Sequence, residues 1–116
     1  MGSVKLGSGI VNALYKDGKE NVWVLSDNVI TILPNSLESS FVVLLNDKKS
    51  KLPAGLFFDM CEYAGKYWIA SYGTGIIELN SDLKINNIYT STDGLSNDGV
   101  YKIFPDKNNL IITTNF

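Results

Sequence analysis

The stretch Leu6-Gly7-Ser8-Gly9-Ile10-Val11-Asn12-Ala13-Leu14-Tyr15-Lys16-Asp17 aligns without a gap with Leu95-Ser96-Asn97-Asp98-Gly99-Val100-Tyr101-Lys102-Ile103-Phe104-Pro105-Asp106. The two stretches are 89 residues apart, and apolar residues coincide at Val11 and Val100 and at Leu14 and Ile103. A third copy lies midway, at Phe57-Phe58-Asp59-Met60. The chain is therefore built from internal repeats.

A second set of matching segments gives the length of the repeat. The triplets Val22-Trp23-Val24, Tyr67-Trp68-Ile69 and Leu110-Ile111-Ile112 mark corresponding points, and their middle residues are 45 and 43 residues apart. A period of about 44 residues with strand-like content is typical of one blade of a β-propeller. One blade cannot bury both of its faces alone, so the repeat also predicts that the blades pack on one another.

Short segments rich in β-branched and aromatic residues alternate with clusters of Gly, Asn, Asp and Pro, which is the pattern of antiparallel hairpins. The sequence predicts four strands in the first repeat, four in the second and two in the third, and no helix. The predicted strands span residues 10–15, 22–25, 29–33, 41–45, 57–63, 66–71, 75–79, 85–89, 100–104 and 110–114. Glycines 65, 73 and 75 are expected to supply positive φ angles in the turns of the second repeat.

These patterns predict an all-β fold, a β-propeller fragment of about two and a half four-stranded antiparallel blades spanning residues 1–116. The repeats cover approximately residues 6–50, 51–94 and 95–116, the last of them incomplete. Closed propellers have more blades, and open sheet edges invite pairing with another chain. We expect either the remaining blades of a longer parent chain or self-association of copies, and the former is favoured because the sequence stops within a repeat.

Composition narrows the classes of function. Hydrophobic residues make up 45% of the 116 residues and charged residues 19%, which is typical of a globular protein. The basic residues are all lysines and the net charge is −2, so nucleic-acid binding is not expected. The longest apolar run, Phe41–Leu45, is too short to span a membrane, and no membrane contact by this segment is predicted.

The residue types that carry most chemistry are scarce. Without histidine a Ser-His-Asp triad is excluded within this chain, and the common zinc ligand is missing. Cys61 has no partner for a disulfide and lies in an apolar-alternating run, so a buried structural thiol is predicted. No catalytic residue, metal or cofactor is expected.

Two tryptophans recur at one position of the repeat. Trp23 and Trp68, with Ile111 at the third such position, are predicted to pack between neighbouring blades, because a recurrent site usually serves the stacking of repeats. The alternative is that the indole faces stack on sugar rings. Tyr72, Asn97 and Asn115 fall in loops that gather at one end of a propeller, where we would look first for a ligand.

The Asp and Glu residues are predicted to have structural rather than metal-binding or catalytic roles. The loop from Asp93 to Asp98 could hold calcium through its oxygens, but turn-forming hydrogen bonds to local amides are favoured. Paired carboxylates could serve a glycosidase, yet spacing places no two of them across one cleft. Glu78 alternates with Ile77 and Leu79 and is therefore predicted to lie on a solvated strand face.

The stretch Asp93-Gly94-Leu95-Ser96-Asn97-Asp98-Gly99-Val100-Tyr101-Lys102-Ile103 resembles the opening of the two-component regulator propeller repeat. Its second half is similar to Gly65-Lys66-Tyr67-Trp68-Ile69-Ala70-Ser71-Tyr72-Gly73-Thr74-Gly75-Ile76. The chain departs from the family pattern where Ala70 replaces a glycine and Ile111 a tryptophan, and the middle repeat has a shortened opening.

In that family the repeats build the periplasmic sensor of bacterial hybrid two-component receptors, many of which detect oligosaccharides. The resemblance implies that this chain is part of an extracytoplasmic ligand-sensing propeller, located in the periplasm or outside the cell, with an oligosaccharide as a possible ligand. The alternative is a structural or interaction module of a surface or secretion-associated protein, since the same repeats occur there. An enzyme such as a polysaccharide lyase would need catalytic residues from elsewhere.

Overall fold

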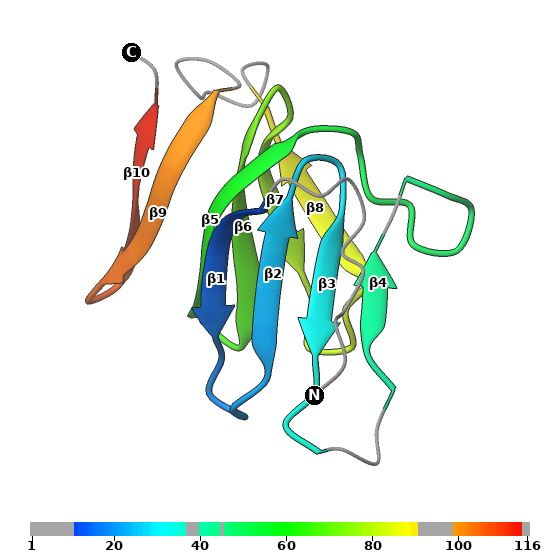
Figure 1. Cartoon of the computed structure of the whole chain (residues 1–116). Coiled ribbons are helices and arrows are strands. Elements are labelled where there is room, and N and C mark those ends of the chain that lie inside the picture. Colours follow the sequence, from blue (N-terminus) through cyan, green and yellow to red (C-terminus); the bar gives the residue numbers. More distant parts are fainter. Residues whose placement is uncertain (1–10, 37–39, 45, 91–98, 115–116) are drawn as a thin grey trace.

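Three antiparallel sheets follow one another along the chain in the computed structural model, which describes residues 11–36, 40–44, 46–90 and 99–114. The first sheet, blade 1, has the strand order β1-β2-β3-β4 (Figure 1). Its strands are β1 (Val11–Lys16), β2 (Val22–Ser26), β3 (Ile30–Leu33) and β4 (Val42–Leu44).

Blade 2 has the order β5-β6-β7-β8, and the two-stranded blade 3 pairs β9 with β10. These strands are β5 (Leu56–Tyr63), β6 (Lys66–Tyr72), β7 (Gly75–Leu79), β8 (Ile85–Tyr89), β9 (Val100–Asp106) and β10 (Asn109–Thr114). The predicted all-β class is confirmed, and every predicted strand has its counterpart; Ile10 and Leu45 lie outside the described residues.

The strand β9 extends two residues further than predicted. β9 continues through Pro105, which pairs with Leu110, to Asp106, which pairs with Asn109. Proline lacks an N–H group, but alternate residues of an antiparallel strand direct their N–H away from a given partner. A proline at such a position of a strand that has one neighbour leaves the pairing intact.

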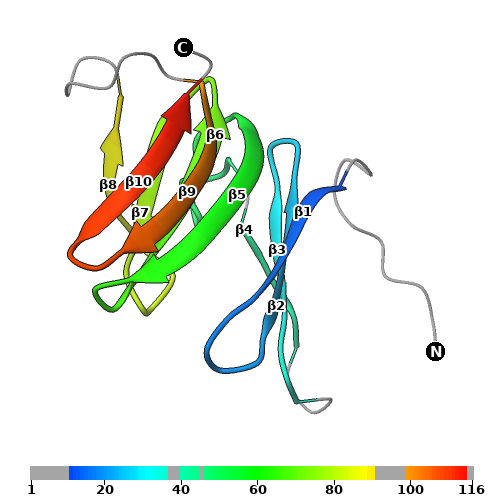
Figure 2. The same cartoon turned by 90° about the vertical axis from the view of Figure 1, so that its left-hand side faces the viewer.

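The blades stack face to face with their first strands side by side. β5 contacts both β1 and β9, and Figure 2 shows β5 between them. The faces between the blades hold two apolar clusters. The first joins blades 1 and 2 and includes Trp23, Leu25, Phe57 and Tyr67, whereas the second joins blades 2 and 3 and includes Val100.

Blade 2 contributes to both clusters because a strand points its side chains alternately to its two faces. Along β6, Tyr67 and Ile69 face blade 1, while Trp68 and Ala70 face blade 3. Cys61 belongs to the second cluster and is buried, as predicted. Burial, together with the charges of Asp59 and Glu62, raises the pKa of the Cys61 thiol to about 11.

Each first strand carries a bulge at the same place. The pairing with the second strand skips Asn12 in β1, Phe58 in β5 and Tyr101 in β9. A bulge adds one residue and so changes which side chains share a face. Phe57 and Met60, three residues apart, consequently both enter the first cluster.

The turn from β5 to β6 is a two-residue hairpin formed by Ala64 and Gly65, with φ angles of 54° and 76°. Two successive positive φ angles are the geometry that matches the twist of the flanking strands. Gly73 and Gly75 have φ angles of 103° and 95°, so the predicted role of all three glycines is confirmed. In the part of the chain that the structure describes, no helix is long and apolar enough to cross a membrane.

Candidate functional site

Three residues at one end of the blades were predicted to bind a ligand, and one of them, Tyr72, lies in the part of the chain that the structure describes. Tyr72 is the last residue of β6, is 43% exposed and forms a β-bridge with Gly99. Asn97 and Asn115 lie outside the described residues. The Tyr72–Gly99 bridge between blades 2 and 3 corresponds to the Asp27–Leu56 bridge between blades 1 and 2. At this end of the blades, the backbone therefore links consecutive blades.

The residues predicted to pack between blades have three different surroundings. Trp23 is fully buried between blades 1 and 2. Trp68 is half-buried and packs on the second cluster. Ile111 is half-buried in β10, whereas its neighbours Leu110 and Ile112 pack on the second cluster. Strand alternation therefore directs Ile111 to the face of blade 3 that is turned away from blade 2.

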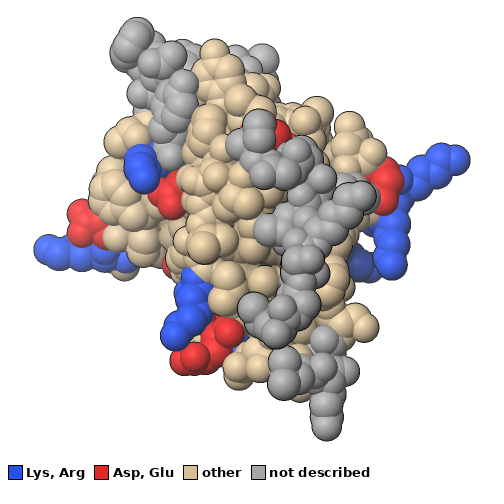
Figure 3. Space-filling model, viewed as in Figure 1, with Lys and Arg blue, Asp and Glu red and all other residues tan. Residues whose placement is uncertain are grey.

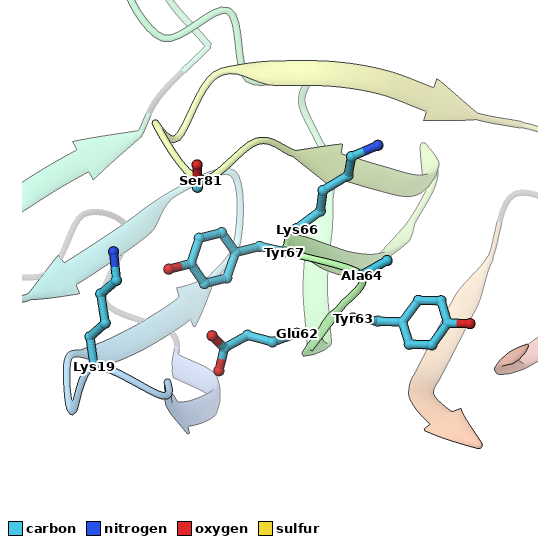
Figure 4. Close-up of a pocket in the computed structure, with 8 residues that line it drawn as sticks. Lys19, Glu62, Tyr63, Ala64, Lys66, Tyr67 and Ser81 are labelled. Carbon is cyan, nitrogen blue, oxygen red and sulfur yellow. The ribbon is translucent and has the colours of Figure 1, made fainter. Parts of the chain in front are cut away.

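A polar cleft lies at the opposite end from Tyr72, where blades 1 and 2 meet. Its volume is about 350 Å³, and the turns β1–β2, β5–β6 and β7–β8 form its walls. It is lined by Lys19, Glu62, Tyr63, Ala64, Gly65, Lys66, Tyr67 and Ser81. In Figure 4 the side chains of Lys19, Glu62, Tyr67 and Ser81 lie on one side, and Tyr63 points the other way.

Glu62 forms the floor of the cleft and ties the two blades together. Its carboxylate accepts hydrogen bonds from the backbone N–H of Gly18 at 2.8 Å and from the phenol of Tyr15 at 3.2 Å. Burial, with a smaller contribution from the adjacent Glu62 charge, raises the pKa of Tyr15 to about 12. The Tyr15 phenol therefore stays protonated and acts as a donor to Glu62.

Tyr67 forms the wall between the cleft and the core. Its side chain is 8% exposed, and its ring centroid lies 4.5 Å from that of Trp23 at an interplanar angle of 41°. Burial first, and then the charges of Asp17 and Glu62, raise the pKa of Tyr67 above its ordinary value of 10.0. The apolar core thus ends at a hydroxyl group that keeps its proton.

Behind this wall, Asp17 organises the β1–β2 turn. It is 4% exposed, and its carboxylate accepts hydrogen bonds from the Trp23 indole at 2.9 Å and from the backbone N–H groups of Lys19 and Asn21, both at 2.9 Å. Burial opposes ionisation, but these hydrogen bonds outweigh it and hold the pKa of Asp17 below its ordinary value. Asp17 places Lys19 at the mouth of the cleft and fixes the orientation of Trp23.

The cleft therefore offers several hydrogen-bond donors and acceptors. Lys19 and the phenols donate, Glu62 accepts, and Ser81 can do either. Such a mixture suits a small uncharged polar ligand with several hydroxyl groups. Among the described residues, no group of three or more His, Cys, Asp or Glu gathers in a way that could hold a metal ion.

The prediction for Glu78 was wrong. Its side chain is 2% exposed, because β7 lies between β6 and β8 and has both faces covered. The carboxylate pairs with the Lys66 ammonium at 2.9 Å and accepts hydrogen bonds from the Tyr89 phenol at 2.7 Å and from the Asn86 amide. Burial disfavours the charged form, yet these partners outweigh it and hold the pKa of Glu78 below its ordinary value.

The sequence analysis did not identify the cleft residues Lys19 and Ser81, nor Tyr15 as the partner of Glu62. The cleft exists only where two blades pack, so no local pattern marks it. One signal was available: an acidic residue lies beside the first turn of each full repeat, Asp17 directly after β1 and Glu62 near the end of β5, although the two positions are not equivalent. Recurrent acidic residues at one turn suggest contacts between neighbouring turns.

Solved structures with the same fold come from bacterial surface proteins. Two are crystal structures of the extracellular domain of BT4673 from B. thetaiotaomicron, described once as a one-component and once as a hybrid two-component system. They have TM-scores of 0.73 and identities of 18% and 17%, covering 90% and 93% of this chain. PorZ, an essential surface component of the type-IX secretion system of Porphyromonas gingivalis, has a TM-score of 0.68 and 22% identity over 90% of this chain.

This likeness shows the fold, and it covers only part of the matched proteins. This chain spans 16 or 17% of the length of each of those structures. No family model matches the sequence, and no curated protein matches it either. The blades of this chain thus have the fold of part of the extracellular domain of a hybrid two-component system and of part of a secretion-system surface protein.

Proposed function

We propose that this chain is part of the extracytoplasmic ligand-sensing propeller of a hybrid two-component signalling receptor. The observation that supports this proposal most is the match to the BT4673 extracellular domain, which covers 93% of the chain with a TM-score of 0.73. The resemblance of its repeats to the two-component regulator propeller family points the same way. The proposed location is the periplasm or the outside of a bacterial cell.

The proposed ligand is an oligosaccharide. The cleft between blades 1 and 2 supports this choice, since Lys19, Glu62, Tyr67 and Ser81 present donors and acceptors around a volume of about 350 Å³. Sugar hydroxyls both donate and accept, so a mixed set of partners suits them. The proposed role is binding without catalysis, and the phenols of Tyr15 and Tyr67 would serve as hydrogen-bond donors.

Signalling would require that the ligand distinguishes two arrangements of the blades. A ligand shifts a conformational equilibrium only as far as its affinities for the two states differ. Glu62 spans blades 1 and 2 through Gly18 and Tyr15, so a ligand at Glu62 competes with contacts that set how these blades pack. Ligand capture would then be coupled to blade geometry.

The test is calorimetric titration of the chain with soluble oligosaccharides, neutral and uronate-containing. Ser81→Trp should block the cleft and abolish binding, because Ser81 is exposed and a larger side chain there can fill the cleft without entering the core. Tyr72→Ala, at the opposite end, is the matched control. Loss of binding in Tyr72→Ala alone would place the ligand at the loop end, and no binding to any oligosaccharide would contradict carbohydrate sensing.

A second candidate is a structural or interaction module of a surface or secretion-associated protein. The match to PorZ, with a TM-score of 0.68, favours it. The sequence of the parent gene beyond Phe116 separates the two candidates. A membrane span and kinase motifs would support the receptor, whereas adhesion or secretion domains would support the interaction module.

A further inference from the structure

A groove of about 700 Å³ runs along the outer side of blades 1 and 2. One of its sides is formed by β4 and the connection that follows β4, and the other side is formed by the β7–β8 turn of blade 2. Its lining residues are Phe41, Val42, Val43, Leu44, Lys49, Ser50, Lys51, Asp82, Leu83 and Lys84. None of them takes part in the cleft around Glu62.

The groove follows the free edge of a sheet. Successive residues of a strand point to opposite faces, so a cavity that touches four consecutive residues, Phe41 to Leu44, must run along the side of the strand. β4 is the outermost strand of blade 1, and among the strands that the structure describes it pairs with β3 alone. An edge strand directs alternate N–H and C=O groups outward, where another strand can bind them.

The side chains along this edge are apolar, and the rim is basic. Phe41, Val42 and Val43 are 50%, 39% and 40% exposed. Three exposed lysines, Lys49, Lys51 and Lys84, line the groove together with a single acidic residue, Asp82. In Figure 3 basic side chains project at the right-hand edge, where Figure 1 places the connection after β4.

The outer strand of blade 2, β8, exposes polar residues where β4 exposes apolar ones. The exposed residues of β8 are Asn86 and Asn87, and both side chains are engaged within the sheet. The Asn86 amide donates to Glu78, and the Asn87 carbonyl accepts from the N–H of Ile88. Edge strands are usually protected by charged or polar residues, and β8 follows this rule while β4 does not.

We propose that the edge of β4 binds an extended peptide that carries alternating apolar and acidic residues and adds to blade 1 as a fifth strand. The apolar residues would contact Phe41 and Val43, which share one face of the sheet, and the carboxylates on the other face would pair with Lys49, Lys51 and Lys84. The excess of lysine selects an acidic partner, and the outward backbone groups of β4 select an extended one. This inference stands independently of the proposed sensing function.

The first experiment measures binding of a fluorescein-labelled peptide of alternating valine and glutamate by fluorescence polarisation at low salt. A peptide of alternating valine and lysine and a fully N-methylated valine–glutamate peptide are the controls. Strand addition predicts binding of the first peptide alone, because N-methylation removes the backbone donors but keeps charge and side chains. Equal binding of the N-methylated peptide would mean adsorption by charge and would overturn the proposal, as would no binding of the unmodified peptide.

The second experiment locates the site. Lys49→Glu/Lys51→Glu/Lys84→Glu should weaken peptide binding by about tenfold or more, since three exposed ion pairs become repulsive. Lys102→Glu/Lys107→Glu, two exposed lysines of blade 3, is the matched control and should bind as the parent chain does. Equal affinity of the triple variant would overturn the proposal. Light scattering that shows dimers broken by Val42→Lys would assign the edge to a second copy instead.

Discussion

Trp23 and Trp68 occupy the same position in the second strands of successive blades, yet their surroundings differ. Trp23 is fully buried, packs on Tyr67 and donates its indole N–H to the carboxylate of Asp17. Trp68 is half-buried, stacks on Tyr89 with ring centroids 6.0 Å apart, and donates to the backbone carbonyl of Tyr63 at 2.9 Å. Both indoles are thus anchored at the turn that precedes their strand.

The difference follows from what lies opposite. Trp23 faces the four strands of blade 2, whereas Trp68 faces blade 3, which has two strands among the described residues. The position in the repeat sets the direction of the side chain, and the neighbouring sheet sets its burial. A tryptophan that recurs at one position of the repeat therefore predicts the direction of its side chain better than its contribution to the free energy of unfolding.

The largest expected effect is that of Trp23→Ala. It should lower the free energy of unfolding by about 3–5 kcal/mol, because it leaves a cavity in a filled core and removes the indole donor from Asp17. Trp68→Ala, the matched variant, should cost less, since part of its surface is already exposed to water. Urea denaturation of both variants checks this, and equal losses would contradict the role given to the neighbouring sheet.

Met60→Ala and Leu14→Ala compare a second pair of equivalent positions. Each residue lies two positions after the bulge in the first strand of its blade. Met60 is 2% exposed and Leu14 is 67% exposed. Met60→Ala should cost about 2–4 kcal/mol, and Leu14→Ala should stay within about 0.5 kcal/mol. Thermal unfolding followed by circular dichroism measures both. A large loss in Leu14→Ala would show that a partner covers this face in solution.

Asp17→Asn tests the anchor of Trp23 and its dependence on pH. The variant should lose about 2 kcal/mol at neutral pH, because hydrogen bonds to a charged acceptor are weakened. The pKa of Asp17 is lower in the folded chain than its ordinary value of 3.8, so its contribution is present above pH 3.8 and is lost as the pH falls below it.

Urea denaturation of Asp17→Asn and the parent chain across this range is the measurement. The two stabilities should converge in acid. A constant difference down to the lowest pH would mean that the charge of Asp17 is not what holds the turn.

Among the substitutions of buried residues, the smallest effect is expected for Glu78→Ile, which gives blade 2 the residue that blade 1 has at the equivalent position. Glu78 pairs with Trp68 as Ile32 pairs with Trp23. Lys66 is 38% exposed, so its ammonium can be hydrated once Glu78 is replaced, and the stability should change by less than about 1 kcal/mol. Lys66→Met should be destabilising in the parent chain and harmless in Glu78→Ile. A double-mutant cycle by urea denaturation measures this, and additive losses would show that the pair is not coupled.

The strands and their order could be predicted from the sequence because they depend on local patterns. The hairpin turn at Ala64 and Gly65 and the matching of Val11 with Val100 needed only propensity and period. Glu78 could not be predicted in the same way, because the residues that make its burial tolerable, Lys66 and Tyr89, lie on neighbouring strands. Alternation with Ile77 and Leu79 has the same form whether one face of a strand is covered or both.

The candidate site was still harder to predict. Its residues come from three turns that meet only when two blades pack, and Lys19 and Ser81 have nothing in common along the chain. Tyr72, which the sequence analysis named as a ligand-binding candidate, ends β6 at the other end of the blades and does not line the cleft. A cleft between repeats depends on the angle between sheets, which sequence patterns do not carry.

The bulge that recurs in every first strand has a consequence for how such a chain can evolve. With Asn12, Phe58 and Tyr101 at equivalent places, each first strand shifts its inward side by the same single residue. Unequal recombination between two repeats keeps this phase and yields blades that still interlock. Loss of that one residue would direct the side chains at the start of the strand to the opposite face of the sheet, since a one-residue slip exchanges the two faces. Tandem duplication can therefore lengthen this architecture, but only by whole blades.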